Sequence, residues 1–182
     1  LWGLEGAPSL TALLARELQV EEGDILSHDL MLCPRQRAVV LGPDGEFFQA
    51  PRIDDLACAY ATLEGFLHAS PLPHVGQIWC LFDSEEVGSG TRQGALGSFL
   101  PDVLERLGDL LSLDGQGKRR ALAGSFLLSA DNGHAVHPNF AEKADPENRV
   151  YPNRGVVIKK NANQSYTTTG LTQALFAAIC QQ

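Results

Sequence analysis

Residues 77–90 read QIWCLFDSEEVGSG, an apolar run that ends in three carboxylates within four residues and then in glycines. The segment IWCLF, at 78–82, has the composition of a buried strand. Carboxylates at the end of a core strand are costly, because they repel one another and lose hydration when they are buried. The stretch therefore predicts a sheet and indicates a function at the edge of that sheet.

Helix and strand patterns alternate on both sides of this stretch. Helical spacing of apolar residues covers 54–69 and 94–111, and a second apolar strand pattern, GSFLLSAD, covers 124–131 after a glycine-rich loop at 114–120. Strands that alternate with helices are typical of an α/β fold with three layers and a mostly parallel sheet. We therefore expect an α/β domain over residues 51–182.

The first 50 residues have a different texture. Ser9 precedes a helical pattern over 10–19, and residues 24–33 alternate between apolar and polar side chains. The turn sequence GPDG at 42–45 then separates two β-rich arms, which predicts a hairpin. Residues 1–50 are therefore expected to form an antiparallel piece of their own.

Composition narrows the classes of partner. The 182 residues carry a formal net charge of -8, and KRR at 118–120 is the densest basic cluster, which argues against nucleic acid and anionic membranes as partners. No apolar run approaches the ~20 residues of a membrane span, and we expect no secretory leader. The four cysteines are scattered without a CxxC spacing, so we expect reduced thiols and a cytoplasmic location.

Acidic residues stand at three corners of the expected domain. Asp83, Glu85 and Glu86 follow one strand, Asp131 ends another, and the pair at 54–55 opens a helix. In open α/β sheets the loops that leave the carboxyl ends of the strands converge on a crevice. A divalent metal there would neutralise the acids, while one of two adjacent glutamates binds the metal and the other takes a proton from water.

Other interpretations stay open at this stage. Acidic pairs are often a solvated face or a helix-start preference, which suits residues 54–55. His134 and His137 are either zinc ligands or hydrogen-bonding residues that shape the crevice, and we assign His134 to substrate binding. A nucleophile is disfavoured, because Ser89 lacks the G-x-S-x-G register and Cys80 lies within the apolar strand.

Four segments together resemble one family. PRIDDLA (51–57), FDSEEVGSGTRQGA (82–95), SADNGHAVHPNFAEK (129–143) and GVVIKKNANQSYTT (155–168) are similar, in this order, to segments of the aspartyl aminopeptidases, which are di-zinc metallopeptidases. The resemblance implies a three-layer α/β sandwich of the zinc-dependent exopeptidase type. It also implies that residues 1–50 are the end of an inserted dimerisation domain and that residues 51–182 are part of the catalytic domain.

The resemblance assigns roles to single residues. It implies that Asp54 bridges two zinc ions, that Glu86 binds one of them and that Asp131 binds the other. Glu85 resembles the general base. Lys159 matches a position that recognises the acidic side chain of the substrate. The cofactors implied are two Zn²⁺, with Mn²⁺ or Co²⁺ as alternatives.

The function implied is removal of an N-terminal Asp or Glu from peptides by a homo-oligomer, a dodecamer built of dimers. The family's two histidine zinc ligands lie in segments that have no match in these 182 residues, so we expect three of five ligands, weak zinc binding and poor activity. Two alternatives remain: a binding or assembly module of the same fold that lacks catalysis, and a metal hydrolase with another substrate.

Overall fold

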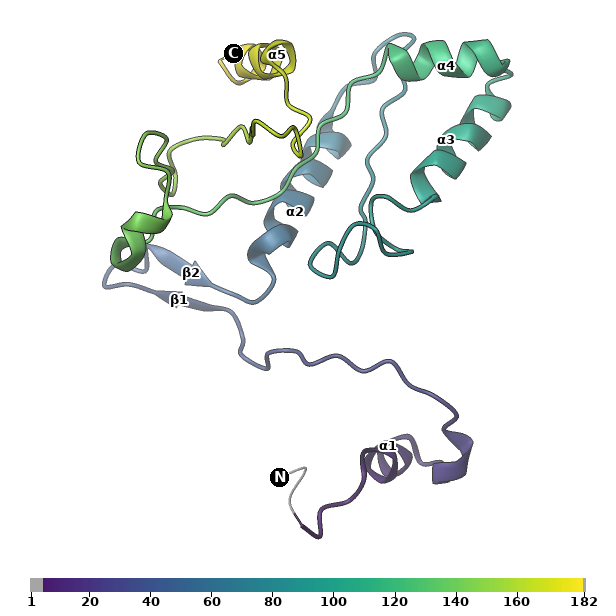
Figure 1. Cartoon of the computed structure of the whole chain (residues 1–182), viewed down its shortest axis with the longest axis vertical. Helices are drawn as coiled ribbons and strands as arrows, with labels where there is room; N and C mark the ends of the chain where they lie inside the picture. The colour runs from purple at the N-terminus through teal and green to yellow at the C-terminus, as the bar shows by residue number, and fades with distance from the viewer. Residues whose placement is uncertain (1–4, 182) are drawn as a thin grey trace. The chain divides into compact units, whose positions relative to one another are not determined.

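The computed structural model describes residues 5–181. The chain divides into two compact units, Leu1–Pro51 and Arg52–Gln182, each of which has its own set of elements (Figure 1). The roles expected for residues 1–50 and 51–182 stay predictions. Among the described helices, none combines the length and the apolar character that crossing a bilayer requires.

The described part of the first unit, residues 5–51, holds the α-helix α1 (Leu10–Leu18) and a hairpin. Helix α1 begins where the sequence predicts it, because the Ser9 side chain accepts a hydrogen bond of 3.0 Å from the Ala12 amide. Strands β1 (Val39–Leu41) and β2 (Phe47–Gln49) pair antiparallel, with Val40 opposite Phe48. The predicted hairpin is therefore confirmed.

The hairpin turn depends on its glycines. Gly42 and Gly45 have φ of +98° and +67°, and the Gly45 amide donates a 3.1 Å hydrogen bond to the Gly42 carbonyl. The alternating segment at 24–33 gives only the end of the short 3-10 helix η1 (Glu22–Asp24), and 25–33 contain no strand. Alternation alone does not make a strand there, because no strand within residues 5–181 pairs with this segment.

The regular elements that the described part of the second unit forms are helices, joined by long irregular segments. They are α2 (Ile53–His68), α3 (Phe99–Leu110), α4 (Gly115–Ala123), the 3-10 helix η2 (Pro138–Lys143) and α5 (Gly170–Cys180). The predicted helix at 54–69 is confirmed as α2, and α3 forms within the pattern at 94–111.

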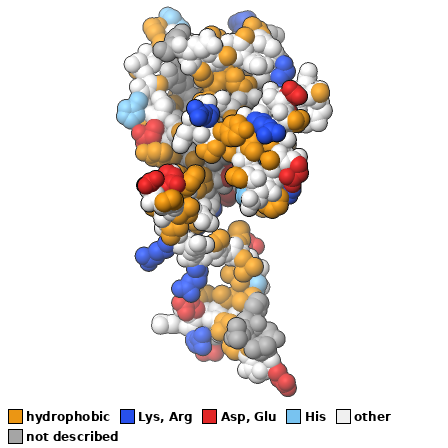
Figure 2. Space-filling view, turned by 90° about the vertical axis from the view of Figure 1, so that its left-hand side faces the viewer, with side chains coloured by type: hydrophobic (Ala, Val, Ile, Leu, Met, Phe, Trp, Pro, Cys, Tyr) orange, Lys and Arg blue, Asp and Glu red, His pale blue; other side chains and the backbone are white. Residues whose placement is uncertain are grey.

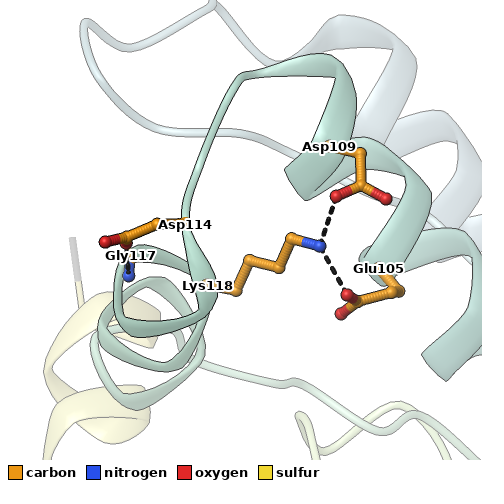
Figure 3. Close-up of polar contacts among 5 residues, drawn as sticks. All are labelled: Glu105, Asp109, Asp114, Gly117 and Lys118. Carbon is orange, nitrogen blue, oxygen red and sulfur yellow. Dashed lines mark hydrogen bonds and ion pairs between the residues drawn. The ribbon is translucent and has the colours of Figure 1, made fainter.

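The segment at 114–120 was predicted to be a loop and is mostly helical instead. The expected glycine loop at 114–120 forms most of α4, because the Asp114 side chain accepts a 2.6 Å hydrogen bond from the Gly117 amide and so caps the helix. Lys118 of α4 then hydrogen-bonds Glu105 and Asp109 of α3 (Figure 3). The cap and this tertiary contact together outweigh the low helix propensity of two glycines.

The three-layer sandwich is not present in residues 5–181. The β1–β2 hairpin is the sheet that these residues form, and the expected strands at 77–83 and 124–131 contain no strand residue. Residues 77–82 and 126–131 make no backbone–backbone hydrogen bond with another described residue. The physical reason is that a parallel strand is stabilised by neighbouring strands on its hydrogen-bonding edges, and the described residues supply none.

Apolar side chains of these extended segments are exposed in consequence. Ile78 is 50% exposed and Leu127 is 79% exposed, and Figure 2 shows hydrophobic side chains spread over the visible face. Among the described residues only Ala15, Gly94 and Gly108 are buried. The described residues therefore do not enclose a core of large side chains.

Helix α2 contacts both extended segments through polar groups. The Trp79 indole donates a 3.1 Å hydrogen bond to Thr62 Oγ1, and Cys58 Sγ donates a 2.8 Å hydrogen bond to Asn132 Oδ1. The first contact joins α2 to the segment at 77–83, and the second joins α2 to the residue that follows Asp131.

Candidate metal centre

Three aspartates come together at the start of α2. The backbone is non-helical at Asp54 (φ -89°, ψ 111°) and at Asp55 (φ -113°, ψ 22°), so the first turn departs from a regular helix. One carboxylate oxygen from each of Asp54, Asp55 and Asp131 lies within 4.8 Å of the other two. Asp131 is far away in sequence, so the fold brings these acids together as the sequence predicts for Asp54 and Asp131.

A cavity of about 350 Å³ lies at this cluster. It is lined by Asp54, Asp131, Asn132, Gly133, His134, Val157, Lys159 and Tyr166. Four of the six residues assigned from the sequence are in this set, namely Asp54, Asp131, His134 and Lys159. Aspartates, a lysine and an aromatic ring around one cavity suit a polar, charged ligand.

Lys159 neutralises part of the acidic charge. Its Nζ donates to Asp131 Oδ2 and, at 2.6 Å, to the Asn132 carbonyl, and it lies 5.9 Å from the centre of the Tyr166 ring. The hydrogen bond from Lys159 holds the pKa of Asp131 below its ordinary value. Burial lowers the pKa of Lys159, but the hydrogen bond and charge of Asp131 outweigh it and raise that pKa overall.

The pKa of Asp55 is shifted in the opposite direction from that of Asp131. Burial raises its pKa, and the negative charge of Asp131 adds to the rise, while the Cys58 thiol beside it opposes the shift. The thiol itself donates to Asn132, and the buried Asp55 Oδ1 has no hydrogen-bond partner among the described residues. A buried carboxylate oxygen without a partner is costly, and a cation in the cluster would satisfy it.

The donor set fits a divalent cation. Three carboxylates supply the oxygen ligands that zinc accepts beside histidine and cysteine, and their combined charge exceeds that of the one lysine nearby. Among the described residues, no histidine or cysteine joins this group of three. The acids can therefore hold a metal, but as an all-oxygen set.

The adjacent pair Glu85 and Glu86 lies elsewhere in the second unit. Both side chains are exposed in a turn that the Gly88 amide closes by a 2.8 Å hydrogen bond to the Ser84 carbonyl. Neither lines the cavity or joins the aspartate cluster. Their assignments as general base and zinc ligand therefore stay predictions.

The two histidines separate in the structure. His134 lines the cavity, whereas His137 caps η2, where its Nδ1 accepts a 3.1 Å hydrogen bond from the Asn139 amide. The His137 ring also packs against Phe140, with the ring centres 5.0 Å apart. Of the two, only His134 is placed to meet a ligand.

Five residues of the cluster and its cavity were not assigned from the sequence, namely Asp55, Asn132, Gly133, Val157 and Tyr166. Asp55 was noted only as one of an acidic pair, and Asn132 follows Asp131 directly, so a polar residue at the end of an expected strand was the available signal. Tyr166 lies 35 positions beyond Asp131, within the segment at 155–168 that resembles the family, and its place in that segment was the available signal.

Comparison with known proteins decides the family. The family model described as aminopeptidase I zinc metalloprotease (M18) matches residues 5–182. This chain belongs to the M18 family. The resemblance drawn from four short segments is thereby confirmed.

Curated M18 relatives extend well beyond this chain. It is 40% identical over 173 residues to the probable M18 family aminopeptidase 2 of Clostridium novyi, covering 95% of this chain and 40% of that protein. The protein of the same name from Streptomyces avermitilis is 37% identical, with 100% and 44% covered. The probable aspartyl aminopeptidase of Ricinus communis is 35% identical, with 95% and 36% covered. This M18 chain thus spans less than half the length of these relatives.

Proposed function

We propose that the M18 protein that contains these residues is a zinc-dependent aminopeptidase that removes N-terminal Asp or Glu from peptides. The observation that carries this proposal is the meeting of Asp54, Asp131 and Lys159 at one cavity. The family description supplies the zinc-dependent aminopeptidase class. The name of the Ricinus communis relative supports the acidic substrate.

Asp54, Glu86 and Asp131 are the residues proposed to hold two zinc ions, with Asp54 between them. When bound, zinc would polarise the scissile carbonyl and lower the pKa of a water molecule. Glu85 is the proposed general base, which takes a proton from water and returns it to the leaving amine. This assignment requires Glu85 and Glu86 to reach the cavity, which neither lines in residues 5–181.

Lys159 can recognise the substrate side chain. An ammonium group has three donors, and Asp131 and the Asn132 carbonyl accept from Lys159. One donor remains for a substrate carboxylate. His134, on the same cavity, is the second proposed substrate contact, and the aspartates favour the ammonium group of the substrate's N-terminus.

A substrate panel tests the proposal. With the full natural chain and added zinc, we expect hydrolysis of aspartyl and glutamyl p-nitroanilides in preference to leucyl and lysyl ones. Glu85→Gln should lower kcat by about 100- to 10,000-fold, because general-base catalysis is worth that much. Glu17→Gln, on the exposed side of α1, is the matched control and should leave kcat unchanged. Equal rates on all four substrates would contradict the acidic preference.

We also propose that the protein assembles as a dodecamer built of dimers, with residues 1–50 contributing to the dimer contact. The exposure of Val40 (71%) and Phe48 (68%) on the hairpin supports a covered face there. A monomer in sedimentation velocity would contradict this.

We propose a cytoplasmic location as well. The four free cysteines support it, and cell fractionation would check it.

A further inference from the structure

Asn132 links the segment that carries Asp131 to helix α2, which carries Asp54 and Asp55. Its Nδ2 donates a 2.8 Å hydrogen bond to the Ile53 carbonyl, and its Oδ1 accepts a 2.8 Å hydrogen bond from Cys58 Sγ. Ile53 immediately precedes Asp54, and Cys58 lies on the next turn of α2. One half-buried amide thus holds two points of α2, on both sides of the aspartate pair.

The same residue also fixes the lysine. Its backbone carbonyl accepts a 2.6 Å hydrogen bond from Lys159 Nζ, and Asp131, its neighbour in sequence, accepts from the same ammonium group. Asn132 follows Asp131 in the chain, bonds to the residue that precedes Asp54 and accepts a hydrogen bond from Lys159. Its side-chain oxygen, its side-chain nitrogen and its backbone carbonyl each make one of these bonds.

The chemistry of an amide suits this position. Asp54, Asp55 and Asp131 repel one another at separations below 5 Å, so the segments that carry them tend to move apart. A neutral amide can donate to a carbonyl on one side and accept from a thiol on the other. A carboxylate could not donate to the Ile53 carbonyl and would add a further negative charge, and an apolar side chain could make neither bond.

We propose that Asn132 is a positioning residue, which sets the spacing between Asp54 and Asp131 for metal binding through its bonds to Ile53 and Cys58. The proposal rests on the proposed function, since it takes these aspartates as metal ligands. It goes further by naming a residue that is not among the proposed metal ligands. Partners of metal ligands commonly change metal affinity by about 10- to 100-fold when they are removed.

The experiment measures zinc affinity by competition with a chromophoric chelator on the full natural chain. Asn132→Ala should raise the zinc Kd by about 10- to 100-fold. Cys58→Ala should raise it less, because it removes one of the two side-chain bonds, and Cys58→Ser should stay close to the unsubstituted protein because a hydroxyl donates the same bond. Asn139→Ala is the control, since the Asn139 side chain is exposed and makes no hydrogen bond among the described residues.

A second readout separates positioning from folding. The visible absorption of the Co²⁺-loaded protein should change in Asn132→Ala, whereas the thermal midpoint of the metal-free protein should stay near that of Asn139→Ala. If Asn132→Ala does not fold, the comparison of Cys58→Ala with Cys58→Ser decides. An unchanged Kd in Asn132→Ala, or in both Cys58 variants, would overturn the inference.

The outcome for Asp131→Asn distinguishes this inference from the proposed function. Loss of zinc in Asp131→Asn with unchanged affinity in Asn132→Ala would leave the metal site standing and remove the positioning role. Absence of zinc from the unsubstituted protein would overturn both.

Discussion

At the scale of single residues, Lys118 of α4 forms ion pairs with two acidic residues of α3. Its side chain is 13% exposed, and its Nζ donates to both Asp109 and Glu105 (Figure 3). The hydrogen bonds that Lys118 donates, first to Asp109 and then to Glu105, raise the pKa of Lys118 above its ordinary value. A raised folded-state pKa gives stability that is fully present below the unfolded pKa of about 10.4 and is lost as pH rises through the folded pKa.

Lys118→Met should therefore lower the thermal midpoint at pH 8, and the difference from the unsubstituted chain should shrink as pH rises above about 10.4. Circular dichroism melts from pH 8 to pH 12 measure this. Lys143→Met is the control, because Lys143 lies over the Phe140 ring and forms no ion pair among the described residues. A difference that stays constant over this pH range would show that Lys118 acts through the packing of its stem.

Single residues also show how far the sequence predicts the site. Asp54, Asp131, His134 and Lys159 were assigned from motifs and meet at one cavity. The role proposed for Asn132 depends on distances to Ile53 and Cys58, more than 70 positions away in the chain, and no local pattern encodes such distances. For Glu85 and Glu86 the resemblance implies roles that stay predictions, and residues 5–181 do not form the parallel sheet that was expected to bring them to the aspartates.

At the scale of elements, two helical glycines differ in their surroundings. A Cβ on Gly108 of α3 would lie 2.9 Å from Cγ and Cε of Lys118, whereas a Cβ on Gly65 of α2 would meet nothing within 4 Å. Gly65→Ala should stabilise the chain by up to about 1 kcal/mol through helix propensity. Gly108→Ala should not gain this stability, because it displaces the stem of Lys118 from α3. Urea midpoints of the two variants test this, and equal gains would contradict it.

Elements also mark where pattern reading fails. The helices α1 and α2 and the hairpin follow local signals, namely a capping serine, helical spacing and a glycine turn, and they were predicted within one residue or nearly so. The loop predicted at 114–120 is helix α4, because Asp114 and Lys118 supply contacts that composition does not reveal. The strands at 77–83 and 124–131 did not form, since strand formation requires a partner as well as a suitable sequence.

At the scale of the whole molecule, the question is whether the extended segments at 77–82 and 126–131 are paired strands in the longer M18 relatives. The backbones of these two segments make no hydrogen bonds to other described residues, and unprotected amides exchange with solvent at nearly the rate of an unfolded chain. In the 182-residue chain we therefore expect fast hydrogen exchange at 77–82 and 126–131, and exchange slower by about tenfold or more within α2 and α3. Mass spectrometry of peptides from these regions measures it.

The Clostridium novyi relative provides the comparison, because 40% of its length matches 95% of this chain. If the apolar pattern encodes sheet strands, the matching segments of that longer protein should be protected, since paired strands in a core exchange slowly. Fast exchange in this chain with protection in the relative would mean that the pattern is a true strand signal whose partners lie outside residues 5–181. Fast exchange in both proteins would contradict the α/β interpretation, and the exposed Ile78 and Leu127 would then need another apolar partner.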